Sequence, residues 1–208
     1  MPSHPGIQLL APSAITLLYV LAFAAAAACV AGLAFRLRGR IASLRPCGGW
    51  RRLLVFGLLQ RRVLTRAAGW AHLAVVAGFV GLAIGAGAMA HLPSARAALK
   101  TFLDAAGLVF VGGIAALLLT RRRSAGAVTV LVAMLYVGMS GFMLEALRVR
   151  LGSADPAGFG GRWLAMFLPL HHGYTLLWWS HVLVVLGMLA ALPFCTLLHV
   201  VAAPLTMM

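Results

Sequence analysis

The chain alternates long apolar runs with short segments that are rich in arginine. Five of the apolar runs have about the 20 residues that a helix needs to cross a bilayer. No soluble domain or internal repeat is evident between them. We therefore predict an all-α integral membrane protein, a single domain over residues 1–208, with five transmembrane helices. The predicted helices cover residues 13–35, 69–90, 102–120, 127–147 and 174–200.

The segments between the predicted helices differ in charge. Residues 36–66 carry nine arginines and residues 121–123 carry three more, whereas the segments on the other side carry five basic residues. Because basic residues are retained on the cytoplasmic side, we expect the N-terminus outside and the C-terminus in the cytoplasm. Within the basic loop 36–66, residues 50–64 predict an amphipathic surface helix, which lies on the membrane or docks a soluble partner. Residues 163–168 form a second apolar segment that we expect on the membrane surface.

Composition narrows the classes of function. The 208 residues are 63% hydrophobic and 10% charged, far below the charge of a soluble domain. The net charge of +14 would suggest nucleic acid in a soluble protein, but here the basic residues lie between spans, so we expect lipid and no nucleic acid as partner. The N-terminal residues lack a basic region, so we expect the first apolar run to be a retained span. None of the three cysteines forms a CxxC pair, so no intrinsic iron–sulfur cluster is expected.

The last predicted span holds two histidines in an otherwise apolar run. His181 and His199 are 18 residues apart, which is five helical turns, so they share one face. Their separation of about 27 Å is close to the thickness of the hydrocarbon core. A polar ring within a span usually has a function. The pattern predicts one site near each membrane surface and favours axial ligation of two b-type haems. We therefore expect the five helices to form a haem-binding bundle.

The second predicted span also holds two histidines, His72 and His91, which are 19 residues apart. This span runs in the opposite direction to the last one, so His72 and His199 are predicted at one depth, and His91 and His181 at another. Nineteen residues is 100° past five turns, so His91 faces differently from His72 on an ideal helix. The glycines between them permit either close helix packing or the approach of a flat macrocycle: Gly78, Gly81, Gly85 and Gly87.

Two stretches carry a resemblance to a known family. Residues 178–200, from Trp178-Trp179-Ser180-His181 through Pro193-Phe194 to Leu198-His199, resemble the last helix of the respiratory nitrate reductase gamma subunit family. His72 with Gly78-Phe79-Val80-Gly81 resembles that family's second helix. Residues 58–62 and 141–148 are more similar to related membrane cytochromes that serve heterodisulfide-reductase-like iron–sulfur proteins.

The resemblance implies a subunit of the bacterial cytoplasmic (inner) membrane that binds haem b and oxidises quinol. Electrons would pass to a cytoplasmic iron–sulfur subunit, and the chain would be the electron-transfer subunit of an oxidoreductase complex. It implies that His72 and His199 bind the inner haem and that His181 binds the outer one. The family's partner for His181 corresponds to Leu82, which cannot bind iron. Either His91 replaces it, giving two haems, or the outer haem is absent, giving one.

Oxidation of quinol releases protons, and the chain's three acids, Asp104, Glu145 and Asp155, all fall on the predicted outer side. Glu145 is interpreted as a proton acceptor or as a structural partner of Arg148. Asp104 is interpreted as an acceptor or as a charge at a helix N-terminus. Lys100 would bind a quinone carbonyl or a lipid headgroup.

Two other classes of function compete with the cytochrome. A haem-free membrane anchor would only tether a partner in a respiratory complex. A small transporter would place polar groups at mid-membrane and often shows an internal repeat, whereas this chain keeps its ionisable groups near the two surfaces. Because the chain ends soon after the fifth predicted helix, we expect any catalytic or iron–sulfur domain to be a separate chain.

Overall fold

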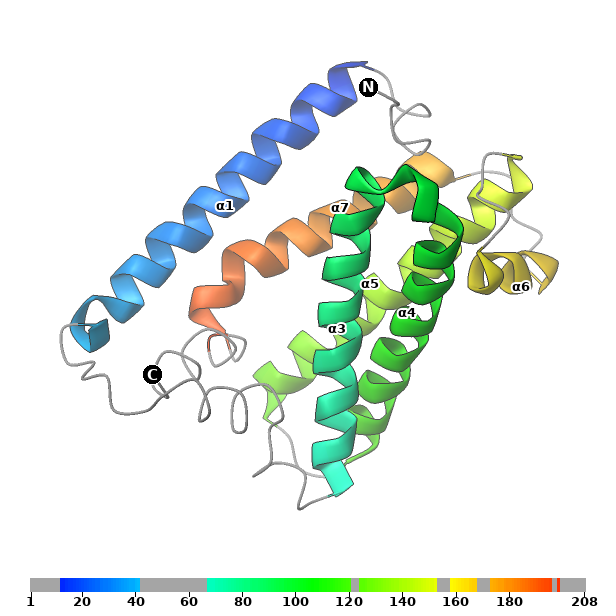
Figure 1. The fold of residues 1–208 in the computed structure, drawn as a ribbon. Helices are drawn as coiled ribbons and strands as arrows, with labels where there is room; N and C mark the ends of the chain where they lie inside the picture. Colours follow the sequence, from blue (N-terminus) through cyan, green and yellow to red (C-terminus); the bar gives the residue numbers. More distant parts are fainter. Residues whose placement is uncertain are drawn as a thin grey trace.

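The computed structural model describes residues 12–41, 67–120, 124–152, 158–167, 173–195 and 198. Within these ranges all regular elements are helical, and five helices are long and apolar enough to cross a membrane. The predicted five-span, all-α architecture is confirmed at this level, and successive spans alternate in direction (Figure 1). The five are α1 (Pro12–Ile41), α3 (Ala67–His91), α4 (Arg96–Leu119), α5 (Ala125–Arg150) and α7 (Tyr174–Ala191).

Two elements on one side of the bundle extend the helical content beyond the prediction. A short 3-10 helix, Pro93–Ala95, leads directly into α4, which therefore begins six residues before the predicted start. Proline is favoured in the first turn of a helix, and the following alanines and leucine are strong helix formers. A further helix, α6 (Phe159–Phe167), lies between α5 and α7, where we predicted a loop with an apolar segment.

Helices α3 and α4 form the tightest pair in the described chain, because glycines remove side chains from the contact. A Cβ atom on Gly78 would lie 2.6 Å from the backbone nitrogen of Phe110, and one on Gly113 would lie 2.9 Å from the carbonyl oxygen of Ala71. Gly81 and Gly85 also face α4. Only Gly87 among the predicted set has open space around it, so the macrocycle interpretation fails for the other three.

The core of the bundle is centred on α4. Ile114 is fully buried and packs with Phe110 of the same helix, Val75 of α3 and Met134 of α5. In the most apolar 18-residue window of α4, 39% of the residues are buried, whereas none is buried in the corresponding window of α7. Helix α7 therefore lies at the periphery, packed against α5 and α1, with no extensive contact to α3 in the described residues.

Helix α7 ends earlier than the predicted Val200. The α-helix stops at Ala191, a 3-10 turn covers Leu192–Phe194, and Cys195 is extended. Pro193 explains the end, because its ring clashes with the preceding helical turn and it lacks a backbone N–H. The turn rests on α1, where a Cβ atom on Gly32 would lie 2.8 Å from Cγ of Pro193. Pro193 therefore ends the α-helix inside the apolar run.

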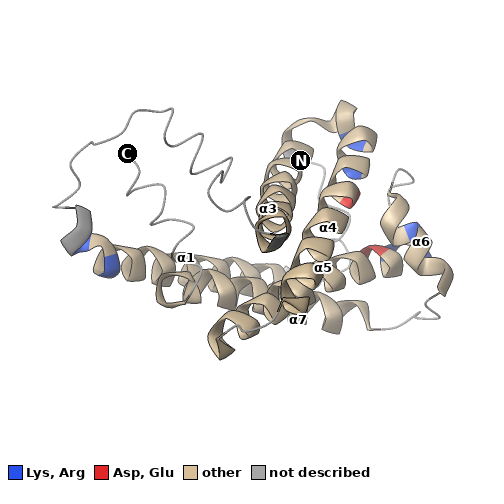
Figure 2. Cartoon of the chain, turned by 90° about the horizontal axis from the view of Figure 1, so that it is seen from below, with Lys and Arg blue, Asp and Glu red and all other residues tan. Residues whose placement is uncertain are grey.

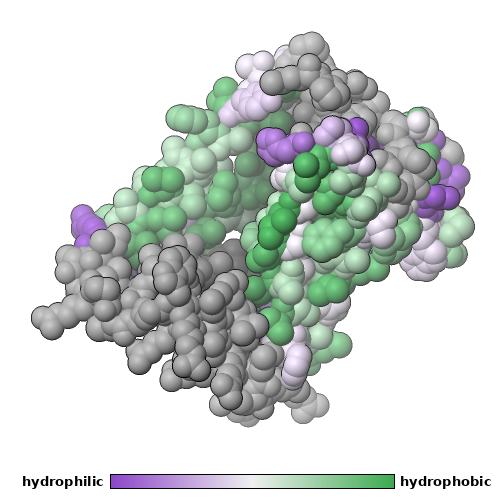
Figure 3. All heavy atoms as spheres, viewed as in Figure 1, coloured by the Kyte–Doolittle hydropathy of each residue, from purple (hydrophilic) through white to green (hydrophobic). Residues whose placement is uncertain are grey.

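The charged residues of the described chain gather at the ends of the helices. Figure 2 shows them where α4, α5 and α6 meet and at the far end of α1, with long uncharged stretches between. Figure 3 shows the corresponding apolar surface over the helices, with hydrophilic residues toward their ends. This distribution is typical of spans that cross an apolar layer.

Candidate functional site

Four charged side chains from two helices form one buried cluster, called here the charged cluster: Lys100 and Asp104 of α4, and Glu145 and Arg148 of α5. The ammonium Nζ of Lys100 lies 3.3 Å from Oδ1 of Asp104 and 3.3 Å from Oε1 of Glu145. Nη1 of Arg148 donates to Oε2 of Glu145 at 3.1 Å. Asp104 is 3% exposed and Glu145 is 6% exposed. Two cations and two anions are thus combined into a formally neutral group that tolerates burial.

Helix α6 covers the charged cluster. The backbone N–H of Gly160, in the first turn of α6, donates to Oδ2 of Asp104 at 2.8 Å. Asp104 therefore places a negative charge at the positive end of α6. At the other end, the guanidinium of Arg150 donates to the carbonyl oxygen of Ala165. Side chains of opposite charge thus hold the two ends of this nine-residue helix.

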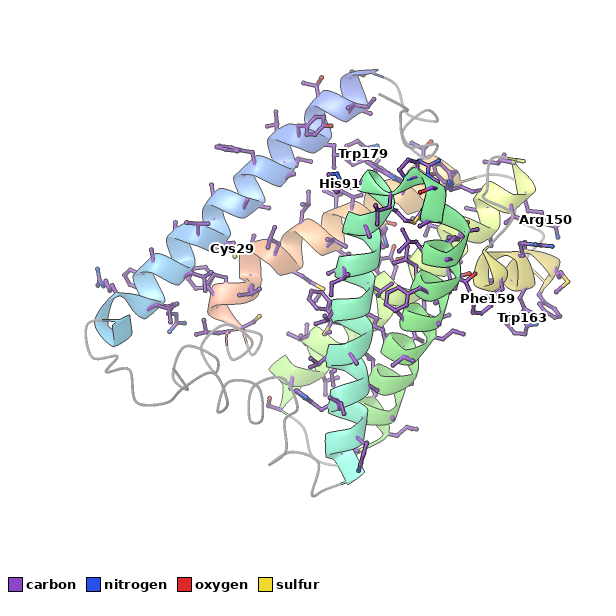
Figure 4. All side chains as sticks on the ribbon, viewed as in Figure 1. Cys29, His91, Arg150, Phe159, Trp163 and Trp179 are labelled. Carbon is purple, nitrogen blue, oxygen red and sulfur yellow. The ribbon has the colours of Figure 1, made fainter. Side chains whose placement is uncertain are left out.

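Glycines let α6 approach so closely. A Cβ atom on Gly161 would overlap Cγ of Glu145, and one on Gly160 would lie 2.6 Å from the ring of Phe142. The opposite side of α6 is apolar and exposed, and Phe159 and Trp163 lie there (Figure 4). The apolar segment predicted over residues 163–168 is thus, as far as Phe167, one exposed face of a helix, and its position on the membrane surface stays a prediction.

The structure brings together all three side chains predicted to handle protons or quinone, Lys100, Asp104 and Glu145. The predicted pair of Glu145 with Arg148 is confirmed. The interpretation of Asp104 as an N-terminal charge of its own helix is wrong, because α4 begins at Arg96 and Asp104 lies in its third turn. Lys100 is bound to two carboxylates and its side chain is 14% exposed, which disfavours a lipid-headgroup anchor. Asp155 lies outside the described residues.

A second polar group, called here the α5–α7 seam, joins two of the spans. Oγ of Ser140 lies 2.7 Å from Nδ1 of His181, and the hydroxyl of Tyr136, one turn earlier on α5, lies 2.6 Å from Oγ of Ser180. Ser140 is 1% exposed. Cε1 of His181 lies 3.9 Å from the position of a Cβ on Gly141, so the ring rests against the surface of α5. No described residue binds the other ring nitrogen, Nε2.

The remaining histidines are distributed over the bundle. His72 is half-buried near the start of α3. His91 is the last residue of α3 and is exposed, at the end of the bundle where α7 begins (Figure 4). His199 lies outside the described residues, so its pairing with His72 stays a prediction. The pairing of His91 with His181 also stays a prediction.

The prediction did not include Ser140, Tyr136 and Ser180, because it was based on ionisable side chains and these three carry hydroxyl groups. The available signal was a set of hydroxyl side chains inside apolar runs, which usually bond a neighbouring helix. Within the described part of the chain, no three His, Cys, Asp or Glu side chains converge as a metal site would require. A metal that is already held by an organic ring, such as a haem iron, needs only one further donor on each side of the ring. A single histidine such as His181 can supply one of these donors.

Comparisons with protein-family models, with curated proteins and with solved structures found no match to this chain.

Proposed function

We propose that this chain is a membrane cytochrome b subunit that exchanges electrons between the quinone pool and a cytoplasmic iron–sulfur partner. The observation that carries the proposal is the environment of His181. Its imidazole lies in an apolar span, Nδ1 is held by the buried Ser140, and Nε2 has no partner among the described residues. A histidine that ligates a metal is commonly held through its other nitrogen in this way.

A haem on this side would need two histidine ligands. His181 would supply one axial nitrogen, and His91 is the residue at the same end of the bundle that would supply the other. His72 and His199 would hold a second haem near the opposite surface, as the family resemblance implies. Haem supplies a reversible one-electron couple.

The charged cluster is the best candidate for receiving protons from quinol. Oε1 of Glu145 is buried and faces the Lys100 ammonium, yet it accepts no hydrogen bond. We take this oxygen as the candidate site of protonation. Protonation would weaken its attraction to Lys100, and the ammonium would then rely on Asp104, 3.3 Å away.

The charge distribution supports one orientation in the membrane and indicates the side on which the partner would dock. The twelve arginines of residues 36–66 and 121–123 place that side in the cytoplasm under the positive-inside rule. The partner would dock there, on the basic loop, most of which lies outside the described residues. The protein would belong to a bacterial inner membrane, as the resemblance implies. The competing function is a haem-free anchor of a respiratory complex.

The proposal is tested by a reduced-minus-oxidised absorption spectrum of the detergent-purified protein, with haem counted per chain. We expect a b-type spectrum with one or two haems. In a two-haem protein His181→Ala should remove one haem, whereas a single haem held by His72 and His199 would be unaffected. Leu183→Ala is the matched control, since Leu183 lies on the same helix and is 51% exposed.

The alternatives give different results. A wild-type protein that binds no haem would overturn the cytochrome proposal and leave the anchor. Two haems in the wild type and one in His91→Ala would identify the fourth ligand. A haem content that is unchanged in His181→Ala would remove the observation on which the proposal depends.

A further inference from the structure

Ser140 is the most deeply buried polar residue of α5, and its single hydroxyl proton can serve only one acceptor. Three groups lie within reach of its Oγ: the carbonyl of Tyr136 at 2.6 Å, the carbonyl of Val137 at 3.2 Å, and Nδ1 of His181 at 2.7 Å. Serine hydroxyls inside helices commonly donate to the carbonyl four residues earlier. The short bond to Tyr136 therefore takes the proton.

With its proton directed to Tyr136, Oγ of Ser140 can only accept from His181. The bond at 2.7 Å then requires a hydrogen on Nδ1 of the imidazole. A neutral imidazole carries one N–H, so Nε2 must hold the lone pair. Ser140 thereby selects the tautomer whose free lone pair lies on the ring nitrogen that no described residue binds.

The surroundings hold the ring in this position. Gly141 leaves space for the ring against the α5 backbone, as Cε1 of His181 lies 3.9 Å from the position of its missing Cβ. One turn away, the Tyr136 hydroxyl bonds Ser180, whose own hydroxyl donates to the carbonyl of Leu177 at 2.9 Å. This neighbouring bond limits rotation of α7 relative to α5.

We infer that Ser140 is a positioning residue that fixes the tautomer and the direction of His181 and so presents Nε2 to the iron of a haem. The inference rests on the proposed function. Removal of a group that bonds the other ring nitrogen of a metal-binding histidine changes the metal affinity by about 10- to 100-fold. Ser140 itself would touch neither the iron nor the substrate.

The test combines one measurement on haem-free protein with one on haem-loaded protein. In haem-free protein, ¹⁵N NMR of the histidine side chains should report the Nδ1–H tautomer for His181 in the wild type. Ser140→Ala should shift the signal toward the Nε2–H tautomer or a mixture, and Ser140→Thr, which keeps the hydroxyl, should restore it. In loaded protein, Ser140→Ala should weaken haem binding by about 10- to 100-fold and shift the midpoint potential.

Tyr136→Phe is the matched control, because it removes the neighbouring hydroxyl of the same seam but leaves the Ser140–His181 bond. It should leave the His181 tautomer and the midpoint potential unchanged. An Nε2–H tautomer in the wild type would overturn the inference, as would equal effects of Ser140→Ala and Tyr136→Phe. If the tautomer depends on Ser140 but no haem binds, the proposed function fails while the hydrogen-bond assignment stands. If haem binds through His181 but Ser140→Ala moves neither readout, the inference alone fails.

Discussion

Helix α5 contributes to two polar groups of opposite character, five residues apart. Glu145 belongs to the charged cluster, in which each charge lies beside one of opposite sign and α6 closes over the group. Ser140 belongs to the α5–α7 seam, which is built from hydroxyls and one imidazole. The first group uses its charges to hold protein elements together. The second leaves one ring nitrogen without a partner in the described chain. The first group is therefore suited to joining helices and accepting a proton, and the second to binding a ligand through the free nitrogen.

Removing the cation between the two carboxylates should have the largest effect. Lys100→Met leaves the buried Asp104 with its bond from the Gly160 N–H and the buried Glu145 with Arg148. Breaking a buried pair in this way typically costs about 3–5 kcal/mol. Thermal unfolding in detergent, followed by intrinsic tryptophan fluorescence, measures the loss. Lys100→Arg is the control that keeps the charge, and it should lose less. Equal stability of Lys100→Met and the wild type would contradict the structural role of the cluster.

A change in the close contact between α6 and α5 should have a smaller effect on stability. Gly161→Ala places a methyl group where it overlaps Cγ of Glu145, and overpacking of this kind costs about 1–3 kcal/mol. Gly187→Ala, on α7, is the matched control, because nothing lies within 4 Å of the added Cβ. The control should be neutral or stabilising by up to about 1 kcal/mol, since alanine favours the helix. The unfolding midpoint should therefore fall in Gly161→Ala and stay the same or rise in Gly187→Ala.

Hydroxyls of the seam should contribute less than the charges. Tyr136→Phe removes the bond to Ser180, and hydrogen bonds between spans average about 0.6 kcal/mol. A double-mutant cycle with Ser180→Ala measures the coupling directly. A loss as large as that of Lys100→Met would break the comparison, because the seam would then be as important for stability as the charged cluster.

The exposed face of α6 should affect stability least. Trp163 is 61% exposed and packs edge-to-face on Phe167, so Trp163→Cys should change the unfolding midpoint little. A nitroxide attached there, in a background without the three native cysteines, should be more accessible to oxygen than to a water-soluble relaxer in lipid nanodiscs. A label that is mainly accessible to the water-soluble relaxer would place this face in water.

Hydropathy predicted the five spans because each needs only a long apolar run, a local property. The predicted helix boundaries are wrong where two local sequence rules favour different structures. Pro93 begins a helix as readily as it interrupts one, and Pro193 ends the α-helix inside the apolar run that predicted a span to Val200. Helix α6 escaped prediction because its glycines, read as loop residues, are packing positions against Glu145 and Phe142.

The members of the candidate site could be named from the sequence, but their arrangement could not. Lys100 and Glu145 are 45 residues apart on different helices, and nothing in a single sequence indicates that α4 and α5 turn these faces toward each other. The bond between Glu145 and Arg148 was predictable, because three residues separate neighbours on one helix face. Ser140 was missed since its importance depends on the position of His181 on another helix.

The pairing pattern of the charged cluster bears on how the protein is made. A charged residue at the centre of a span opposes insertion by about 2.5–3.5 kcal/mol. Lys100 and Asp104 pair within α4, and Glu145 and Arg148 pair within α5, so each segment brings its own counterion to the translocation machinery. We expect the two helices to insert separately, and the contact between Lys100 and Glu145 to form only when they associate within the lipid. Glycosylation mapping of nascent chains that end after α4 should therefore find α4 inserted before α5 is made, and an α4 that stays uninserted until α5 follows would contradict this order.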